Sequence, residues 1–213
     1  MSESPKFPKA VLFDLLTALL DSWSVWNAAA GSETKGRAWR AEYLRLTYGS
    51  GVYVPYEDLV VAAASHVGLP ESVAQSLEAR WLELPVWSGA QQALDALQGR
   101  TLLGVVTNCS KRLGLLAAGR LKTRWDCVVT AEDAGYYKPD PHPYRLALEQ
   151  ISVKAEDAAF VAGSGYDLIG TARMRLRTYW HNRVGLPRPP EAPPAALESS
   201  GLERLVPWLE GLK

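Results

Sequence analysis

The chain has 213 residues, 47% of them hydrophobic, and its 23 basic and 23 acidic side chains give a formal net charge of zero, which argues against nucleic acid or a membrane surface as a partner. Residues 1–9 lack the apolar stretch of an export signal, and no window approaches the roughly 20 apolar residues that span a bilayer. Cys109 and Cys127 form no Cys-x-x-Cys pair, which disfavours a thiolate metal site and favours a reducing, cytoplasmic compartment.

The first predicted element is a short apolar strand at 10–13, which ends at Asp14. A continuous apolar run of this length is typical of a strand that is buried on both faces, as in a parallel sheet. The sequence then becomes helical, and Asp21-Ser22 offers a cap for the first helix. The predicted helices cover 22–30, 35–48, 56–67 and 71–82, and an extended link at 84–87 follows them.

Beyond this link, strands alternate with helices. Strands are predicted at 102–106, 127–129, 159–161 and 178–180, and helices at 90–97, 110–118, 144–150 and 167–174. Such alternation indicates parallel βαβ units. The proline-rich stretch 187–194 is expected to be extended, and it leads to a short final helix that ends near Trp208.

These elements predict an α/β fold, with a doubly wound parallel sheet and a small all-helical domain inserted after the first strand. Residues 1–21 and 88–213 would form the core domain, and residues 22–87 the helical domain. Ligands of open α/β sheets bind beyond the carboxyl ends of the strands. Polar residues of catalytic type follow four of the predicted strands, and we expect them to converge at that edge: Asp14, Thr107, Asn108, Lys138, Ser164 and Asp167.

This set of residue types indicates nucleophilic chemistry. A carboxylate such as Asp14 can attack carbon or phosphorus and form a covalent ester. The ammonium group of Lys138 would keep Asp14 ionised and offset charge during the attack. Asp167 could orient Lys138, activate the hydrolytic water or hold a divalent cation. Thr107 and Asn108 could donate hydrogen bonds to a developing anion.

Four motifs around these residues resemble those of the haloacid dehalogenase-like hydrolase superfamily, and the resemblance covers nearly the whole chain. The motifs stand at 13–21, 106–108, 138–144 and 161–167. The resemblance implies a Rossmann-like core, a helical cap domain at 22–87, and a hydrolase that acts on a small-molecule substrate. It also implies that Asp14 is the nucleophile and carries a covalent aspartyl-ester intermediate.

Two positions separate this chain from the phosphatases of that superfamily. The phosphatases carry an acid two residues after the nucleophile, where this chain has Leu16, and usually Gly-Asp in the fourth motif, where this chain has Ala162-Gly163. A magnesium site would be depleted to Asp14, Asp167 and neutral oxygens, whereas a hard dication prefers several charged oxygen ligands. The preferred interpretation therefore requires no metal or other cofactor, and Mg²⁺ belongs only to the phosphatase alternative.

Three details resemble the 2-haloacid dehalogenase branch. Trp39-Arg40 is similar to the first cap helix of that branch, whose arginine meets the halide or the substrate carboxylate, and a guanidinium suits either anion. Tyr144 matches a tyrosine of the dehalogenase active site, and 180–183 is similar to the Trp-x-Asn-Arg after the fifth strand. The resemblance implies a dehalogenase-like enzyme for a small organic acid, and a homodimer, as dehalogenase relatives often form.

The chain also departs from the dehalogenases. They have a threonine where Ala18 stands, whose hydroxyl helps to hold the nucleophile, so Thr17 would have to replace it from one position earlier. Ser164 stands in place of an asparagine of the fourth motif. Two alternatives therefore stay open beside the dehalogenase: a magnesium-dependent small-molecule phosphatase with a depleted metal site, and a non-catalytic binding protein that retains the fold.

Overall fold

A computed structural model describes residues 7–212, and its centre is a six-stranded sheet in which every pair of neighbouring strands is parallel. The order across the sheet is β3-β2-β1-β4-β5-β6, so the chain winds outward from β1 in both directions. The strands are β1 (Ala10–Phe13), β2 (Leu102–Thr107), β3 (Cys127–Thr130), β4 (Ala158–Ala162), β5 (Arg177–His181) and β6 (Leu197–Ser199). This arrangement confirms the predicted doubly wound parallel sheet.

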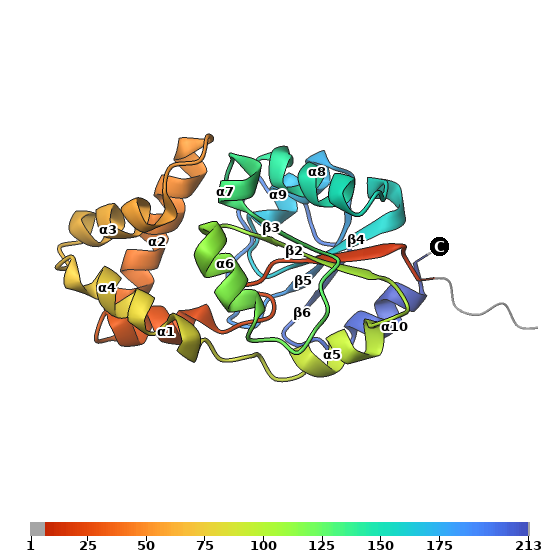
Figure 1. Cartoon of the computed structure of the whole chain (residues 1–213), viewed down its shortest axis with the longest axis horizontal. Helices are drawn as coiled ribbons and strands as arrows, with labels where there is room; N and C mark the ends of the chain where they lie inside the picture. Colours follow the sequence, from red (N-terminus) through yellow and green to blue (C-terminus); the bar gives the residue numbers. More distant parts are fainter. Residues whose placement is uncertain (1–6, 213) are drawn as a thin grey trace, which may run out of the picture.

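Helices cover both faces of this sheet (Figure 1). Because successive side chains of a strand point to opposite faces, Val11 and Phe13 belong to one core and Leu12 belongs to the other. The first core includes residues of α5, α6 and α10, and the second includes residues of α8 and α9. The helices of the sheet layers are α5 (Ala90–Leu97), α6 (Lys111–Ala118), α7 (Ala131–Ala134), α8 (Pro141–Gln150), α9 (Asp167–Arg173) and α10 (Leu205–Glu210), with a 3₁₀ turn η2 (Ala155–Asp157) before β4.

The segment between β1 and α5 is helical and lies beside the sheet (Figure 1). Its elements are α1 (Ser22–Ala29), α2 (Glu33–Ser50), α3 (Tyr56–His66), α4 (Ser72–Ala79) and the 3₁₀ turn η1 (Trp81–Glu83). The side chain of Asp21 accepts a hydrogen bond from the Ser24 amide and caps α1, as predicted. The rings of Trp26 and Trp39 lie 4.5 Å apart between α1 and α2, so these two indoles form the interior of this segment.

Three elements differ from the prediction. The strand β6 was not predicted, because Leu197–Ser199 has a single apolar residue and lies at the exposed edge of the sheet. The four-residue helix α7 is too short to show a helical period. Helix α8 begins at Pro141 instead of residue 144, because Asp140 caps it by accepting a hydrogen bond from the His142 amide and proline suits the first helical position.

The expectation of no export signal concerns residues 1–9, of which 1–6 lie outside the described residues. Across the part of the chain that is described, 7–212, no helix has both the length and the apolar character needed to cross a bilayer.

Candidate active site

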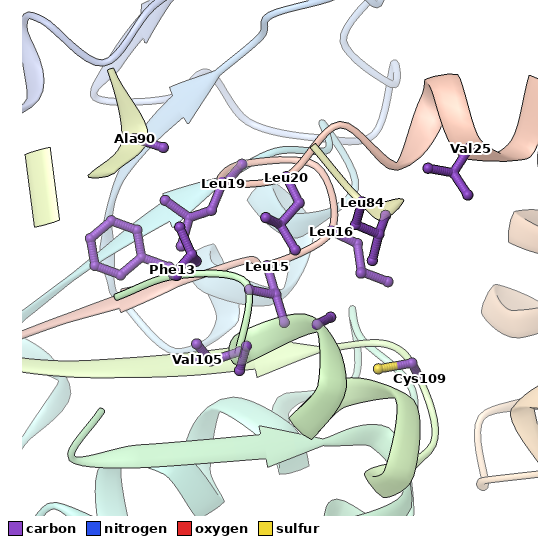
Figure 2. Packing of buried hydrophobic residues seen from close by; sticks show 14 of the residues in the cluster. Phe13, Leu15, Leu16, Leu19, Leu20, Val25, Leu84, Ala90, Val105 and Cys109 are labelled. Carbon is purple, nitrogen blue, oxygen red and sulfur yellow. The ribbon is translucent and has the colours of Figure 1, made fainter. Parts of the chain in front are cut away.

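The loop after β1 is held rigidly at the carboxyl edge of the sheet. The Asp14 amide donates to the carbonyl of Val161 on β4, with a distance of 2.9 Å between nitrogen and oxygen. Leu15 and Leu19, on the same loop, are fully buried and pack into the core below it (Figure 2). The apolar packing fixes the turn, so the carboxylate of Asp14 has a fixed position above the strand ends.

The two carboxylate oxygens of Asp14 have different partners. Oδ2 accepts three hydrogen bonds, from the Thr17 amide at 2.9 Å, the Thr17 hydroxyl at 2.6 Å and the Ala18 amide at 3.2 Å. Oδ1 accepts one, from the Lys138 ammonium at 2.9 Å. The hydroxyl of Thr17 therefore holds Asp14, in the place of the hydroxyl that Ala18 lacks.

Lys138 forms a bridge between two carboxylates. Its ammonium lies 2.9 Å from Asp14 Oδ1 and 2.9 Å from Asp167 Oδ1, and all three side chains are buried. Burial opposes ionisation of Asp14, but the charge of Lys138 and the hydrogen bonds of Thr17 outweigh it and hold the pKa of Asp14 below its usual range. Burial likewise opposes the charge on Lys138, whereas the two carboxylates raise its pKa above the ordinary value.

Asp167 is the more basic of the two carboxylates. Burial raises its pKa above the ordinary range, Lys138 opposes that shift, and the charge of Asp14 adds to it. The Tyr144 hydroxyl donates to Asp167 Oδ1 at 3.2 Å. Within residues 7–212, the buried Oδ2 of Asp167 has no hydrogen-bond partner. An ionisable oxygen in this state can accept a proton from a molecule in the site.

Asn108 fixes the loop that carries Lys138. Its carboxamide donates to the Lys138 carbonyl at 2.9 Å and accepts from the Lys138 amide at 2.8 Å. The neighbouring hydroxyl of Thr107 lies 3.8 Å from the sulfur of Cys109 in the interior. Asn108 lines the cavity beside Asp14, whereas Thr107 and Tyr144 do not.

Arg40 places a buried positive charge in the wall of the cavity that Asp14 also lines. It projects from α2, is 6% exposed, and has no carboxylate within 4.0 Å among the described residues. Its guanidinium donates to the Ser22 hydroxyl at 2.7 Å and lies 3.9 Å from the centroid of the Trp23 ring. Its Nε has no hydrogen-bond partner within 7–212. A buried cation without a counter-charge is a site for an anion.

The carboxylates and Arg40 line a small cavity between α2 and the sheet edge. Its volume is about 60 Å³, counted as the space open to the centre of a water molecule, which is room for a small molecule. Its wall includes Asp14, Arg40, Asn108, Lys138, Ser164 and Asp167, and its apolar part comes from Leu16, Trp23, Leu44 and Leu186.

Three residues at or beside this cavity carry no sequence signal that indicates their role: Ser22, Tyr43 and Tyr48. Ser22 connects two parts of the site, because its hydroxyl donates to the Leu16 carbonyl at 2.5 Å and accepts from Arg40. The Tyr43 hydroxyl on α2 donates to the Asn108 carbonyl at 3.0 Å. Tyr48, also on α2, stacks on Tyr166 with ring centroids 4.2 Å apart. Trp23 on α1 also lines the cavity.

The donor set does not fit a magnesium ion. Among residues 7–212 there is no cluster of three or more His, Cys, Asp or Glu side chains that could hold a metal. The two carboxylates that remain, Asp14 and Asp167, both use Oδ1 to bind Lys138. A dication placed there would have to compete with the Lys138 ammonium for these oxygens. It would also find fewer charged oxygen ligands than magnesium prefers.

Comparison with known proteins places the chain among hydrolases. The model of the haloacid dehalogenase-like hydrolases matches residues 8–174. The chain is 26% identical over 218 residues to (S)-2-haloacid dehalogenase 4A of Burkholderia cepacia, covering 94% of each chain. It is also 26% identical over 220 residues to phosphoglycolate phosphatase 1 of Pseudomonas aeruginosa, covering 95% of this chain and 80% of that one. A crystal structure of an L-2-haloacid dehalogenase superposes with a TM-score of 0.82 at 25% identity, covering 95% of this chain and 99% of the other.

Proposed function

The chain belongs to the haloacid dehalogenase-like hydrolase family, and from this premise we propose that it hydrolyses a small 2-halo acid through an ester on Asp14. The observation that carries the proposal is that the bridged ions Asp14, Lys138 and Asp167 line one small cavity with Arg40, which has no carboxylate partner within residues 7–212. The cavity therefore offers a carboxylate of lowered pKa that is suited to attack and a cation that is suited to bind an anion.

In the first step, Asp14 Oδ1 attacks the carbon that bears the halogen. Oδ2 is held by three donors and Oδ1 by Lys138 alone, so Oδ1 has the more available lone pair. A carbon–oxygen bond forms, the carbon–halogen bond breaks, and halide leaves with the bonding electrons. A halide leaving group needs no proton. The reaction can therefore proceed with Leu16 at the cavity wall, although a leucine side chain cannot donate one.

In the second step, water attacks Asp14 Cγ and its proton passes to the unpartnered Oδ2 of Asp167. The negative charge that develops on Asp14 Oδ2 meets the two amides and the hydroxyl already directed at it. The bond between Cγ and Oδ1 then breaks, the product oxygen takes the proton held by Asp167, and a 2-hydroxy acid is released. The new carboxylic acid of Asp14 loses its proton to solvent, which restores the carboxylate. The sum is 2-halo acid plus water giving 2-hydroxy acid, halide and a proton.

Arg40 binds the carboxylate of the substrate in this proposal or, once the carbon–halogen bond breaks, the halide. Ser22 and Trp23 hold the guanidinium in place, and the apolar wall of Leu16, Leu44 and Leu186 accommodates the halogen and the short alkyl group. Ser164 remains our candidate for a polar contact with the substrate, because it lines the cavity. For Thr107 and Tyr144 we propose positions behind the cavity instead, next to Cys109 and Asp167.

A magnesium-dependent phosphatase is the second candidate, and the similarity to a phosphoglycolate phosphatase favours it. It requires a leaving-group acid, which Leu16 cannot be, and a dication, which the donor set does not fit. We therefore place it behind the dehalogenase. The third candidate is a non-catalytic binding protein. It gives no chemical role to the ion pairs that join Asp14, Lys138 and Asp167.

We further propose that 22–87 is a cap domain and that 1–21 with 88–213 is the core domain. The cavity supports this division, because Arg40 and Leu44 come from α2 and the carboxylates come from the sheet edge. A cytoplasmic location and a homodimer complete the proposal. The location accords with Cys109 and Cys127, which are buried free thiols.

The test of the mechanism is a single turnover in ¹⁸O-labelled water, with enzyme in excess over 2-chloropropionate. The proposal expects the label in the carboxylate of Asp14, located by mass spectrometry of the peptide that contains it, and unlabelled hydroxy acid. Asp167→Asn should release about one equivalent of halide and then retain the ester on Asp14. Label that enters the product directly would contradict the ester intermediate.

A further inference from the structure

On the basis of the proposed role of Asp14 as nucleophile, we propose that Thr17 is a positioning residue for Asp14, and that Thr17 can occupy its place only because residue 163 is a glycine. The pair lies on two different loops, since Thr17 follows β1 and Gly163 follows β4. Both residues line the cavity in which Asp14 reacts.

Thr17 is held so that its hydroxyl must face Asp14. Thr17 is 9% exposed, and its hydroxyl makes the shortest of the three hydrogen bonds to Asp14 Oδ2, at 2.6 Å. The Trp87 indole donates to the Thr17 carbonyl at 3.0 Å, and His181 Nδ1 lies 2.7 Å from the Ala18 carbonyl. The carbonyl groups of Thr17 and Ala18 are therefore both fixed from outside the loop, which leaves the Thr17 hydroxyl little freedom to turn away.

Gly163 is required here by space. A Cβ atom at Gly163 would lie closer than 3.0 Å to the Thr17 hydroxyl, the Thr17 carbonyl carbon and the Ala18 nitrogen. Real Cβ atoms essentially never make such contacts, and two of the three atoms belong to the backbone. Gly163 is also absent from the glycines with positive φ, so its conformation does not require glycine. Any side chain at 163 would push the Thr17–Ala18 peptide away from Asp14.

The chemistry gives the hydroxyl two tasks. It fixes the side chain of Asp14 so that Oδ2 stays at the loop and Oδ1 stays available for attack. It also supplies one of three donors to Oδ2 when water adds to the ester and charge collects on that oxygen. A third effect follows from the first two: a hydrogen bond to the ionised form favours ionisation, so the hydroxyl contributes to the low pKa of Asp14.

The first test measures Asp14 itself and needs no substrate. The carboxyl carbon of Asp14 is titrated by ¹³C NMR and assigned as the signal that Asp14→Asn removes. We expect Thr17→Val, which keeps the shape and loses the donor, to raise the pKa of Asp14. We expect Thr17→Ser, which keeps the donor, to leave it near the wild-type value. An unchanged pKa in Thr17→Val, or equal shifts in Thr17→Val and Thr17→Ser, would overturn the role of Thr17.

The second test examines the pair through halide release. Thr17→Val should lower kcat by on the order of 10²-fold, the loss typical for one donor to a developing oxyanion, and Thr17→Ser should recover most of it. Gly163→Ala should lose at least as much. Adding Thr17→Val to Gly163→Ala should cost little more, because the contact is already broken. If the losses in kcat of the two single variants multiply in the double variant, the pairing is contradicted. Gly49→Ala is the control, because its added Cβ meets nothing within 4 Å.

These two tests separate the inference from the proposed function. If the wild type releases no halide from 2-halo acids, the proposed substrate fails, and the Asp14 titration still decides whether Thr17 holds the carboxylate. If Gly163→Ala does not fold, the Thr17 series decides the same question. A normal titration of Asp14 in Thr17→Val together with rapid halide release would overturn the inference and leave the proposed function standing.

Discussion

At the scale of single residues, the site works by giving two buried carboxylates different basicities. Asp14 has three donors at one oxygen and an ammonium at the other, so it stays ionised at low pH. Burial and the nearby charge of Asp14 raise the pKa of Asp167, although the shared ammonium and the Tyr144 hydroxyl oppose that shift. Groups with pKa values pushed apart in this way can divide the tasks of nucleophile and base between them.

The pH profile should therefore separate the two steps. Asp167 acts as a base only when ionised, and in the ester the charge of Asp14 is gone, so burial is the cause that raises the pKa of Asp167 in that step. Halide release needs ionised Asp14, whose pKa is lowered, so we expect the acid limb of ester hydrolysis at the higher pH. Tyr144→Phe removes a hydrogen bond that lowers the pKa of Asp167. We expect this variant to move the acid limb of hydrolysis to higher pH, measured by rapid quench of the ester. An acid limb that stays in place would show that Tyr144 does not act through Asp167.

Arg40 should control substrate binding more than bond breaking. Arg40→Met removes a buried cation, and loss of a charged hydrogen-bond partner typically costs about 2 to 3 kcal/mol, or roughly 10²-fold in kcat/KM. We expect most of this loss to appear in KM for 2-chloropropionate. Arg37→Met on the same helix is the control, because Arg37 is exposed and bonded to Glu33. Equal kinetics for Arg40→Met and Arg37→Met would remove Arg40 from the site.

At the scale of elements, the separation of α1 and α2 sets the position of Arg40. A Cβ atom at Gly36 would lie 2.6 Å from Asn27 Cα and 2.8 Å from Asn27 N, so these two helices touch backbone to backbone at this point. The close contact places Trp39 against Trp26 and Arg40 above Trp23. The distance between two helices therefore determines where the guanidinium lies.

Substitution of Gly36 should test this contact. Gly36→Ala forces α1 and α2 apart, and overpacking of this kind costs typically about 1 to 3 kcal/mol, so we expect a lower free energy of unfolding and a raised KM together. Gly49→Ala lies in the same helix, in open space, and should be neutral or slightly stabilising, because alanine favours helix over glycine. Urea denaturation of both variants gives the comparison. Equal stability of the two variants would rule out the close contact.

At the scale of the whole molecule, the sequence predicts the fold well because the fold is encoded by long patterns. A parallel sheet that is buried on both faces requires continuous apolar runs, and the sequence has such runs at β1, β2 and β4. The polar residues that follow these runs mark the strand ends. The apolar pattern does not indicate β6, because a strand at the edge of the sheet needs few apolar residues, so β6 was not predicted. The convergence of Asp14, Lys138 and Asp167 was predictable because strand ends meet at one edge.

The remaining features of the site depend on contacts that no local pattern encodes. Thr17 was only an alternative to the missing threonine, and its hydrogen bond depends on a glycine 146 positions away, at Gly163. Ser22 holds Arg40 only because α2 folds back over the loop after β1. Tyr144 could be matched by resemblance, but its contact with Asp167 depends on the packing of α8 against α9.

In the proposed mechanism Asp14 displaces halide from a small acid without a metal, and halide release can be measured directly. Halide release from 2-chloropropionate is followed for the wild type and Asp14→Asn, each with excess chelator and with added magnesium. We expect turnover by the wild type that is the same under both conditions, and none by a folded Asp14→Asn. Halide release that persists in Asp14→Asn, or hydrolysis of an aryl phosphate that requires magnesium in place of halide release, would contradict this mechanism.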